Sequence, residues 1–209
     1  MARLILPLIF GIAGVAVLMA LGFWQLSRLD EKQAVIAEIE ARIGAAPVVL
    51  PEAAEEARDR YLPVVVEGRY TGEAAHVLSS QREQGTGSRV IAVFETTEGR
   101  RVLVDRGFLP DAARVGADLA SGPVTVSGNL HWPRDATDST PPPDMGRGLW
   151  FSRAPGPLAT HLGTEEVLIV ARRDGAAVPG LTTMPVATID IRNDHLEYAI
   201  TWFLLALVW

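Results

Sequence analysis

The chain has 209 residues, 48% of them hydrophobic and 21% charged, and its 19 basic and 25 acidic side chains give a formal net charge of −6. This length suits a single domain, and the acidic balance without a Lys/Arg cluster disfavours a nucleic-acid partner. The absence of cysteine excludes disulfides, thiolate metal sites, covalent c-type haem attachment and cysteine nucleophiles. The most apolar stretches lie at the two ends of the chain.

An uncharged run separates Arg3 from Arg28. At about 1.5 Å per helical residue, residues 4–26 cover the roughly 30 Å hydrocarbon core of a bilayer, which predicts a transmembrane helix. The run is longer than the core of a cleaved signal peptide and ends in Gly22-Phe23-Trp24-Gln25, so a retained anchor is favoured. The Lys and Arg counts of its two flanks are nearly equal, so the positive-inside rule does not orient the helix.

Residues 27–194 are predicted to form one α+β domain outside the membrane. Apolar residues at helical spacing up to Ile43, followed by Gly44, extend the first helix over residues 27–44. A connector follows, with a possible short acidic helix after Pro51. Short β-type runs then occupy residues 62–70, 75–79, 89–97, 101–106, 124–130 and 167–172.

No long helices alternate with these runs, so a small, mainly antiparallel sheet or barrel is predicted. Glu98-Gly99-Arg100 is expected to be a hairpin turn, and Gly85-Thr86-Gly87-Ser88 a second turn. Residues 132–163 are rich in Pro and Gly and are predicted to form a long loop. Its Leu149-Trp150-Phe151 triplet is too apolar to leave in water and should pack on the domain or contact a partner.

The C-terminal residues 195–209 are predicted to form a second transmembrane helix. The apolar run from Leu196 to Trp209 is short for a complete crossing and, taken alone, suits a buried helix or half a span. It stops within an unbroken apolar stretch with no polar cap. We therefore expect this span to be truncated at Trp209, or the natural chain to continue beyond it.

Three segments together resemble the surfeit-locus family of cytochrome c oxidase assembly factors. The first is a Gly-x-Trp-Gln-x-x-Arg-x-x-x-Lys pattern that starts at Gly22, and the second is Val104-Asp105-Arg106-Gly107, where Phe108 replaces the family's Trp. The third, at the second membrane entry, contains Asn193, His195, Leu196, Tyr198, Ala199, Thr201, Trp202 and Phe203. The segments follow the family's order and spacing, and the third is the most specific.

The resemblance implies two transmembrane helices, both termini in the cytoplasm, and a main domain in the periplasm of a bacterium, anchored in the inner membrane. It implies a chaperone-like role in the respiratory chain, in which the protein helps to insert haem a into the oxidase. The implied partners are the catalytic subunit of the oxidase, haem a synthase and the lipid bilayer.

His195 is the candidate ligand of the haem iron, with Tyr198 and Trp202 at i+3 and i+7 on the same helix. A neutral imidazole is a good iron ligand, and aromatic neighbours suit a flat macrocycle. The same three residues could instead form an interfacial belt at the lipid headgroups. Spacing alone favours the belt, whereas the resemblance favours haem.

Trp24 and Arg28 lie one turn apart on the first helix, at the depth that His195 would occupy if the two helices pair. Arg28 is therefore a candidate for binding a haem propionate. Snorkelling and aromatic anchoring explain the same residues without a ligand.

The remaining polar candidates have structural interpretations. Arg106 is expected to form an ion pair with Asp105 or another carboxylate. His76, His131 and His161 lack a second ligand at metal spacing and are expected to be surface or hydrogen-bonded histidines. No nucleophile elbow, phosphate loop or metal-helix motif occurs, so an enzyme is not predicted. The leading function is a haem-handling assembly factor, and the alternative is a membrane-anchored scaffold that stabilises an oxidase intermediate without binding haem.

Overall fold

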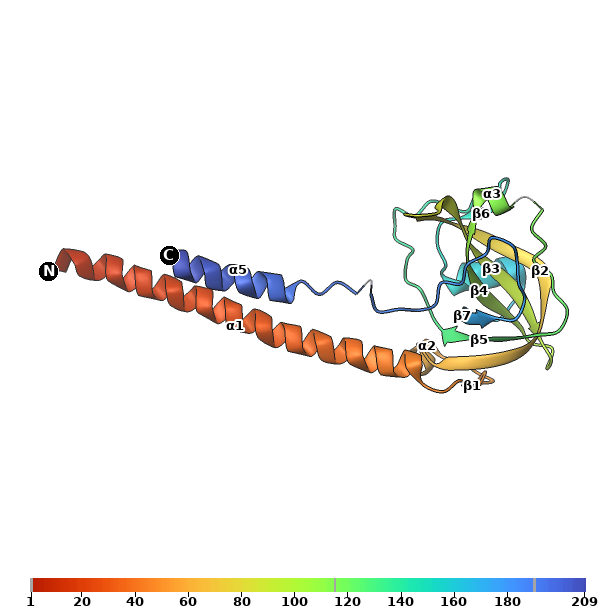
Figure 1. Ribbon diagram of the computed structural model, residues 1–209, viewed down its shortest axis with the longest axis horizontal. Coiled ribbons are helices and arrows are strands. Elements are labelled where there is room, and N and C mark those ends of the chain that lie inside the picture. The colour runs from red at the N-terminus through yellow and green to blue at the C-terminus, as the bar shows by residue number, and fades with distance from the viewer. Residues whose placement is uncertain (1, 115, 190) are drawn as a thin grey trace. The chain divides into compact units, whose positions relative to one another are not determined.

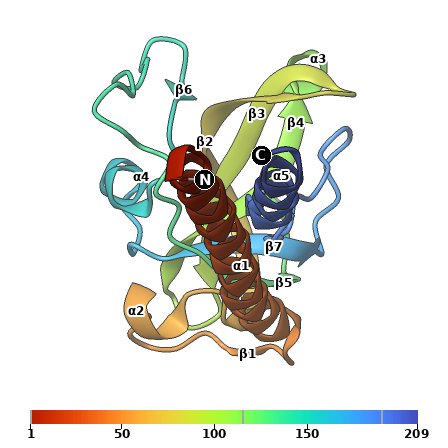
Figure 2. The same ribbon diagram turned by 90° about the vertical axis from the view of Figure 1, so that its left-hand side faces the viewer.

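The computed structural model describes residues 2–114, 116–189 and 191–209 (Figure 1). They form two compact units, one from Met1–Ala41 and Ala187–Trp209 and the other from Arg42–Val186. The first unit is helical and the second is built around a β-sheet (Figures 1 and 2).

The helical unit consists mainly of α1 (Ala2–Gly44) and α5 (His195–Val208). In the described residues, α1 is the one helix that is long and apolar enough to cross a membrane, and its large apolar side chains are exposed around the helix. Such a surface is costly in water and suits a lipid environment. The predicted N-terminal membrane helix is thus supported, whereas α5 is apolar but has only 14 residues.

The two helices pack through small residues. Gly22 of α1 and Ala199 of α5 are buried, and a Cβ added to Gly22 would lie 2.3 Å from a ring carbon of Phe203. Phe203 also meets Phe23 edge to face, with ring centroids 5.4 Å apart. Glycine therefore allows the close helix approach that is common in membrane helix pairs.

The described residues of the second unit form seven strands and three short helices. Their bounds are β1 Val48–Val49, α2 Glu56–Asp59, β2 Pro63–Gln81, β3 Gly85–Thr96, β4 Arg101–Pro110, α3 Asp111–Arg114, β5 Val124–Leu130, β6 Leu149–Trp150, α4 Pro155–Leu162 and β7 Leu168–Asp174. The pairings run from β2 through β3, β4, β7 and β5 and return to β2, so the sheet closes into a small barrel (Figure 1).

The α+β class is confirmed, but the sheet is mixed. The hairpin neighbours are antiparallel, whereas β1 and β6 run parallel to β2, and β7 runs parallel to β4. The chain from β4 to β7, which includes β5, is long enough to bring β7 back alongside β4 in the parallel direction, which a tight turn cannot do.

Two local predictions need correction. The runs at 62–70 and 75–79 belong to one long strand, β2, whose pairing with β3 shifts register between Tyr70 and Ala74. The segment Gly85–Ser88 is the start of β3 and not a turn, because Ser79–Gln81 pairs with Gly85–Gly87. The turn lies instead at residues 82–84. The hairpin turn at Glu98-Gly99-Arg100 is confirmed, with Gly99 at a φ of 81°.

The barrel interior is a continuous apolar core that includes Val64, Val90, Phe94, Leu130 and Ile169, all fully buried. A second cluster lies beneath α4 and β6, where Trp150 packs with Leu158. The predicted loop at 132–163 therefore contains a strand and a helix. The expectation that its aromatic triplet packs on the domain is confirmed for Trp150.

Buried ion pairs join neighbouring strands of the barrel. Arg106 is fully buried, pairs with Asp174 at 2.7 Å and lies over the Tyr70 ring at 3.9 Å. Asp105 pairs instead with Arg89 at 2.6 Å. The structural interpretation of Arg106 is thus confirmed, with Asp174 as the carboxylate. Burial is the main cause of the raised pKa of Tyr70.

Candidate functional site

The site begins where α5 begins. Residues 195–208 form a helix because they are almost entirely apolar and contain no glycine or proline. Asp194 occupies the N-cap position, although its side chain makes no capping hydrogen bond. The first helical residue is His195, whose ring lies against α1.

His195 contacts a buried glutamine of α1. Its Nδ1 lies 2.8 Å from Oε1 of Gln25, whose exposed fraction is only 9%. An amide oxygen only accepts hydrogen bonds, so Nδ1 is the donor in this contact, and in the neutral form of the ring Nε2 carries the lone pair. Histidines that bind metals commonly have the ring held in this way by a hydrogen bond from the other nitrogen. The contact with Gln25 therefore orients the His195 ring and leaves Nε2 as the nitrogen that could bind a metal.

An open hollow of about 400 Å³ lies beside this pair. It is lined by Gln25, Arg192, Asp194, His195 and Tyr198. Arg192 is 81% exposed and forms an ion pair with Asp194. The hollow thus combines an imidazole, an aromatic ring and a guanidinium.

The structure places the two aromatic candidates of α5 differently. Tyr198 lines the hollow but is 51% exposed. Trp202 lies one turn beyond the buried Ala199, and its indole Nε1 is buried without a hydrogen-bond partner in the described part of the chain. The Oδ1 atom of Asn193 is likewise buried and has no hydrogen-bond partner among the described residues. Neither Trp202 nor Asn193 lines the hollow, so the structure does not bring Trp202 together with His195 there.

The two candidates on α1 do not reach the hollow. Trp24 is exposed, and the guanidinium of Arg28 lies 5.8 Å from the centre of its indole ring. Arg28 also pairs with Glu31 at 2.8 Å. Neither residue lines the hollow. The residue between them, Gln25, is the one that faces His195.

Sequence reasoning did not select Gln25, Arg192 or Asp194 as site residues. A signal existed for Gln25, because it is a polar residue within an apolar helix and belongs to the first motif. A buried amide needs a hydrogen-bond partner, which points to a contact with another helix. Arg192 and Asp194 gave no comparable signal, since charged residues are common just before a helix.

The other three histidines belong to the barrel unit. His76 lies 3.0 Å from Oγ of Ser88, and His161 packs on Trp150 with ring centroids 5.3 Å apart. His131 stacks on Tyr61, but its Nδ1 is buried without a partner among the described residues, so it is neither a surface nor a fully hydrogen-bonded histidine. The described residues contain no group of three His, Cys, Asp or Glu that could hold a metal ion.

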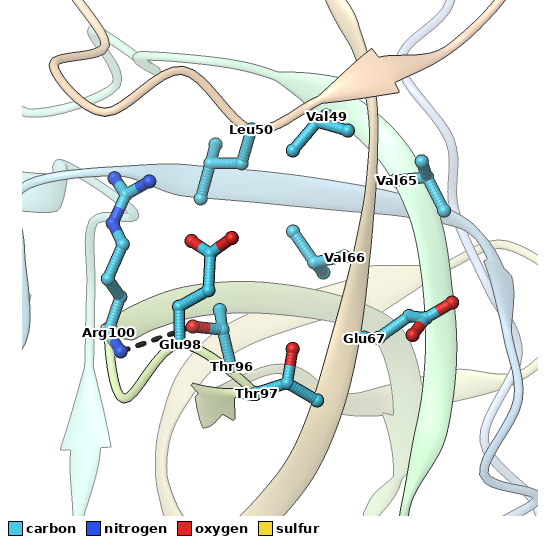
Figure 3. Close-up of a pocket in the computed structure, with 9 residues that line it drawn as sticks. All are labelled: Val49, Leu50, Val65, Val66, Glu67, Thr96, Thr97, Glu98 and Arg100. Carbon is cyan, nitrogen blue, oxygen red and sulfur yellow. Dashed lines mark hydrogen bonds between the residues drawn. The ribbon is translucent and has the colours of Figure 1, made fainter.

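A smaller pocket of about 210 Å³ lies at the edge of the barrel (Figure 3). Its apolar wall includes Val49 and Val66, and Glu67 and Glu98 stand at its side. The guanidinium of Arg100 donates hydrogen bonds to Glu165 and to the carbonyl oxygen of Pro51, so these groups already occupy it. This pocket lacks an imidazole and is small for a macrocycle.

The sequence profile of the SURF1 family matches residues 12–207 of the chain. The chain belongs to the SURF1 family. This result confirms the resemblance, and the match includes both α1 beyond its first turns and most of α5.

Curated relatives from animals and bacteria agree with this assignment. Surfeit locus protein 1 of Xenopus tropicalis is 30% identical over 207 residues, covering 88% of this chain and 67% of the relative. The human protein of the same name is 29% identical, and the match covers 88% of this chain and 68% of the human protein. The SURF1-like protein of the bacterium Rickettsia felis is 29% identical over 203 residues, which cover 91% of this chain and 88% of the bacterial protein. The chain thus spans about two thirds of the animal proteins and most of the bacterial one.

Proposed function

We propose that this SURF1-family protein is an assembly factor for a haem-copper cytochrome c oxidase. In this role it binds haem a at the α1–α5 junction and assists its insertion into the catalytic subunit. The family's association with oxidase assembly supports the general role. The geometry at His195 supports the haem-binding step, which is the finer part of the proposal.

The observation that carries the proposal is the hydrogen bond between His195 and Gln25. It holds the ring in the helix junction through Nδ1, so Nε2 is the nitrogen that can bind iron when the ring is neutral. The haem, when bound, supplies an iron centre that accepts this lone pair. Tyr198 lines the same hollow and offers an aromatic ring beside the imidazole. The protein's own residues thereby orient a ligand and hold it without chemical conversion.

The proposed setting is the bacterial inner membrane, with α1 and α5 in the bilayer, the barrel unit in the periplasm and both termini in the cytoplasm. The apolar surface of α1 supports the anchor. The proposed partners are the oxidase catalytic subunit, as acceptor of the haem, and haem a synthase, as its source. A protein held at the membrane edge could receive haem from one membrane protein and pass it to another.

Deletion of the protein tests the assembly role. The oxidase purified from the deletion strain should contain less haem a per catalytic subunit, while total membrane haem a persists because synthesis does not depend on this protein. Complementation with the wild-type chain should restore the ratio. An oxidase that is present in the normal amount and has a normal haem a content would refute the assembly role. A normal haem a ratio in a smaller amount of oxidase would favour the scaffold that does not handle haem.

A further inference from the structure

An exchangeable ion pair lies at the rim of the hollow beside His195. Arg192 donates from its Nε to the carboxylate of Asp194, and both residues line the hollow. Arg192 is largely exposed. Exposed ion pairs contribute little to stability, so this guanidinium can change its partner at little cost.

Asp194 lies at the start of α5 but does not cap the helix. Aspartate is among the preferred N-cap residues, yet its side chain makes no capping hydrogen bond here and is occupied with Arg192. The positive end of the α5 dipole therefore remains available beside the guanidinium. An anionic group that enters the hollow would meet both.

Arg28, the arginine first considered for a carboxylate, is engaged elsewhere. It pairs with Glu31, lies over the Trp24 ring and does not line the hollow. Arg192 shares the hollow with the candidate iron ligand. A guanidinium can bind a carboxylate through two parallel hydrogen bonds, which suits the acidic substituents of a haem.

We propose that Arg192 recognises a carboxylate of the porphyrin and that Asp194 holds this guanidinium until the ligand replaces it. The inference rests on the proposed haem-binding function and assigns a specificity residue to the same site. The exchange is non-covalent: the porphyrin carboxylate takes the place of the Asp194 carboxylate as acceptor. Asp194 therefore competes with the ligand.

Titration of the full chain in detergent with haemin and with haemin dimethyl ester tests this assignment. Arg192→Gln should weaken haemin binding about fivefold, the size expected for one exposed charge pair, and leave ester binding unchanged. Asp194→Asn should strengthen haemin binding by about twofold, because a competing acceptor loses its charge. Arg69→Gln, which breaks an exposed ion pair with Glu95 on the barrel, is the matched control and should change neither affinity.

Equal losses for haemin and its ester in Arg192→Gln would overturn the inference, and so would unchanged haemin binding. The inference would also be overturned if Arg28→Gln, and not Arg192→Gln, weakened the binding of haemin while leaving the binding of its ester unchanged. Metal-free protoporphyrin IX separates this test from iron ligation. If His195→Ala leaves haemin binding intact while Arg192→Gln still weakens protoporphyrin binding, iron ligation fails and the role of Arg192 stands.

Discussion

His131 is the histidine whose environment departs most from that of a free imidazole. Its ring stacks on Tyr61, and burial, assisted by the charges of Arg153, Arg60 and Arg89 and opposed by that of Asp135, lowers its pKa to about 4. An unfolded histidine has a pKa of about 6.5. Between these values the unfolded chain binds a proton that the folded chain does not. The free energy of unfolding therefore falls as the pH drops from about 6.5 to about 4, and this effect is absent above 6.5.

We expect the urea midpoint of the full chain in detergent to fall between pH 7 and pH 5. His131→Phe, which keeps a ring on Tyr61, should reduce this fall. Burial also lowers the pKa of His76, so a smaller pH dependence in the same direction should remain. His161→Phe is the control for loss of an imidazole and should retain the wild-type dependence. Equal slopes in wild type and His131→Phe would show that His131 is not the titrating group.

At the scale of single residues, the sequence indicated His195 as a candidate iron ligand, and the structure places it against α1, but its partner could not be found from the sequence. The motif that contains Gln25 was visible in the sequence. The 2.8 Å contact between Gln25 and His195 depends on which face of α1 meets α5, and this choice is made by packing and not by local propensity. The same reason explains why Trp24 and Arg28, one residue before and three after Gln25, lie outside the hollow.

The pairing of α1 with α5 depends on the glycines of α1. A Cβ at Gly22 would lie within 2.3 to 2.7 Å of three ring carbons of Phe203, whereas a Cβ at Gly11 would meet nothing within 4 Å. Gly22→Ala should therefore push α5 away at a cost of about 1 to 3 kcal/mol, as overpacking usually does. Gly11→Ala should be neutral or slightly stabilising, because alanine favours helix.

Hydrogen exchange of the α5 amides measures this difference. We expect faster exchange in Gly22→Ala than in wild type, and unchanged exchange in Gly11→Ala. The two substitutions lie on one helix and add the same methyl group, so they control for each other. Equal exchange in both variants would show that close approach at Gly22 does not hold the helix pair together.

At the scale of elements, hydrophobic pattern was sufficient for most strands of the barrel. The run at 124–130 matches β5 at both ends, because alternation and turn residues mark it clearly. The β2 strand was divided in the prediction, since Thr71, Gly72 and Glu73 interrupt the apolar pattern at the point where the pairing shifts register. The parallel pairing of β7 with β4 could not be read locally, because it depends on contacts between residues far apart in the sequence.

At the scale of the whole molecule, the proposed topology makes a direct prediction. Alkaline phosphatase fused at Gly85, in the barrel unit, should be active because the enzyme requires an extracytoplasmic location to fold. A cytoplasmic reporter at the same position should be inactive. Reporters fused before residue 4 test the cytoplasmic N-terminus in the same way. The opposite pattern at Gly85 would reject a periplasmic barrel.

The central claim is that haem binding by this SURF1-family protein depends on His195, and the Soret absorbance of protein co-expressed with haem a synthesis tests it most directly. His195→Ala should lose most of the bound absorbance while its α5 amides keep wild-type hydrogen exchange, and His76→Ala and His161→Ala should retain the band. A folded His195→Ala protein that carries haem with an unchanged spectrum would contradict the account and favour the interfacial aromatic belt.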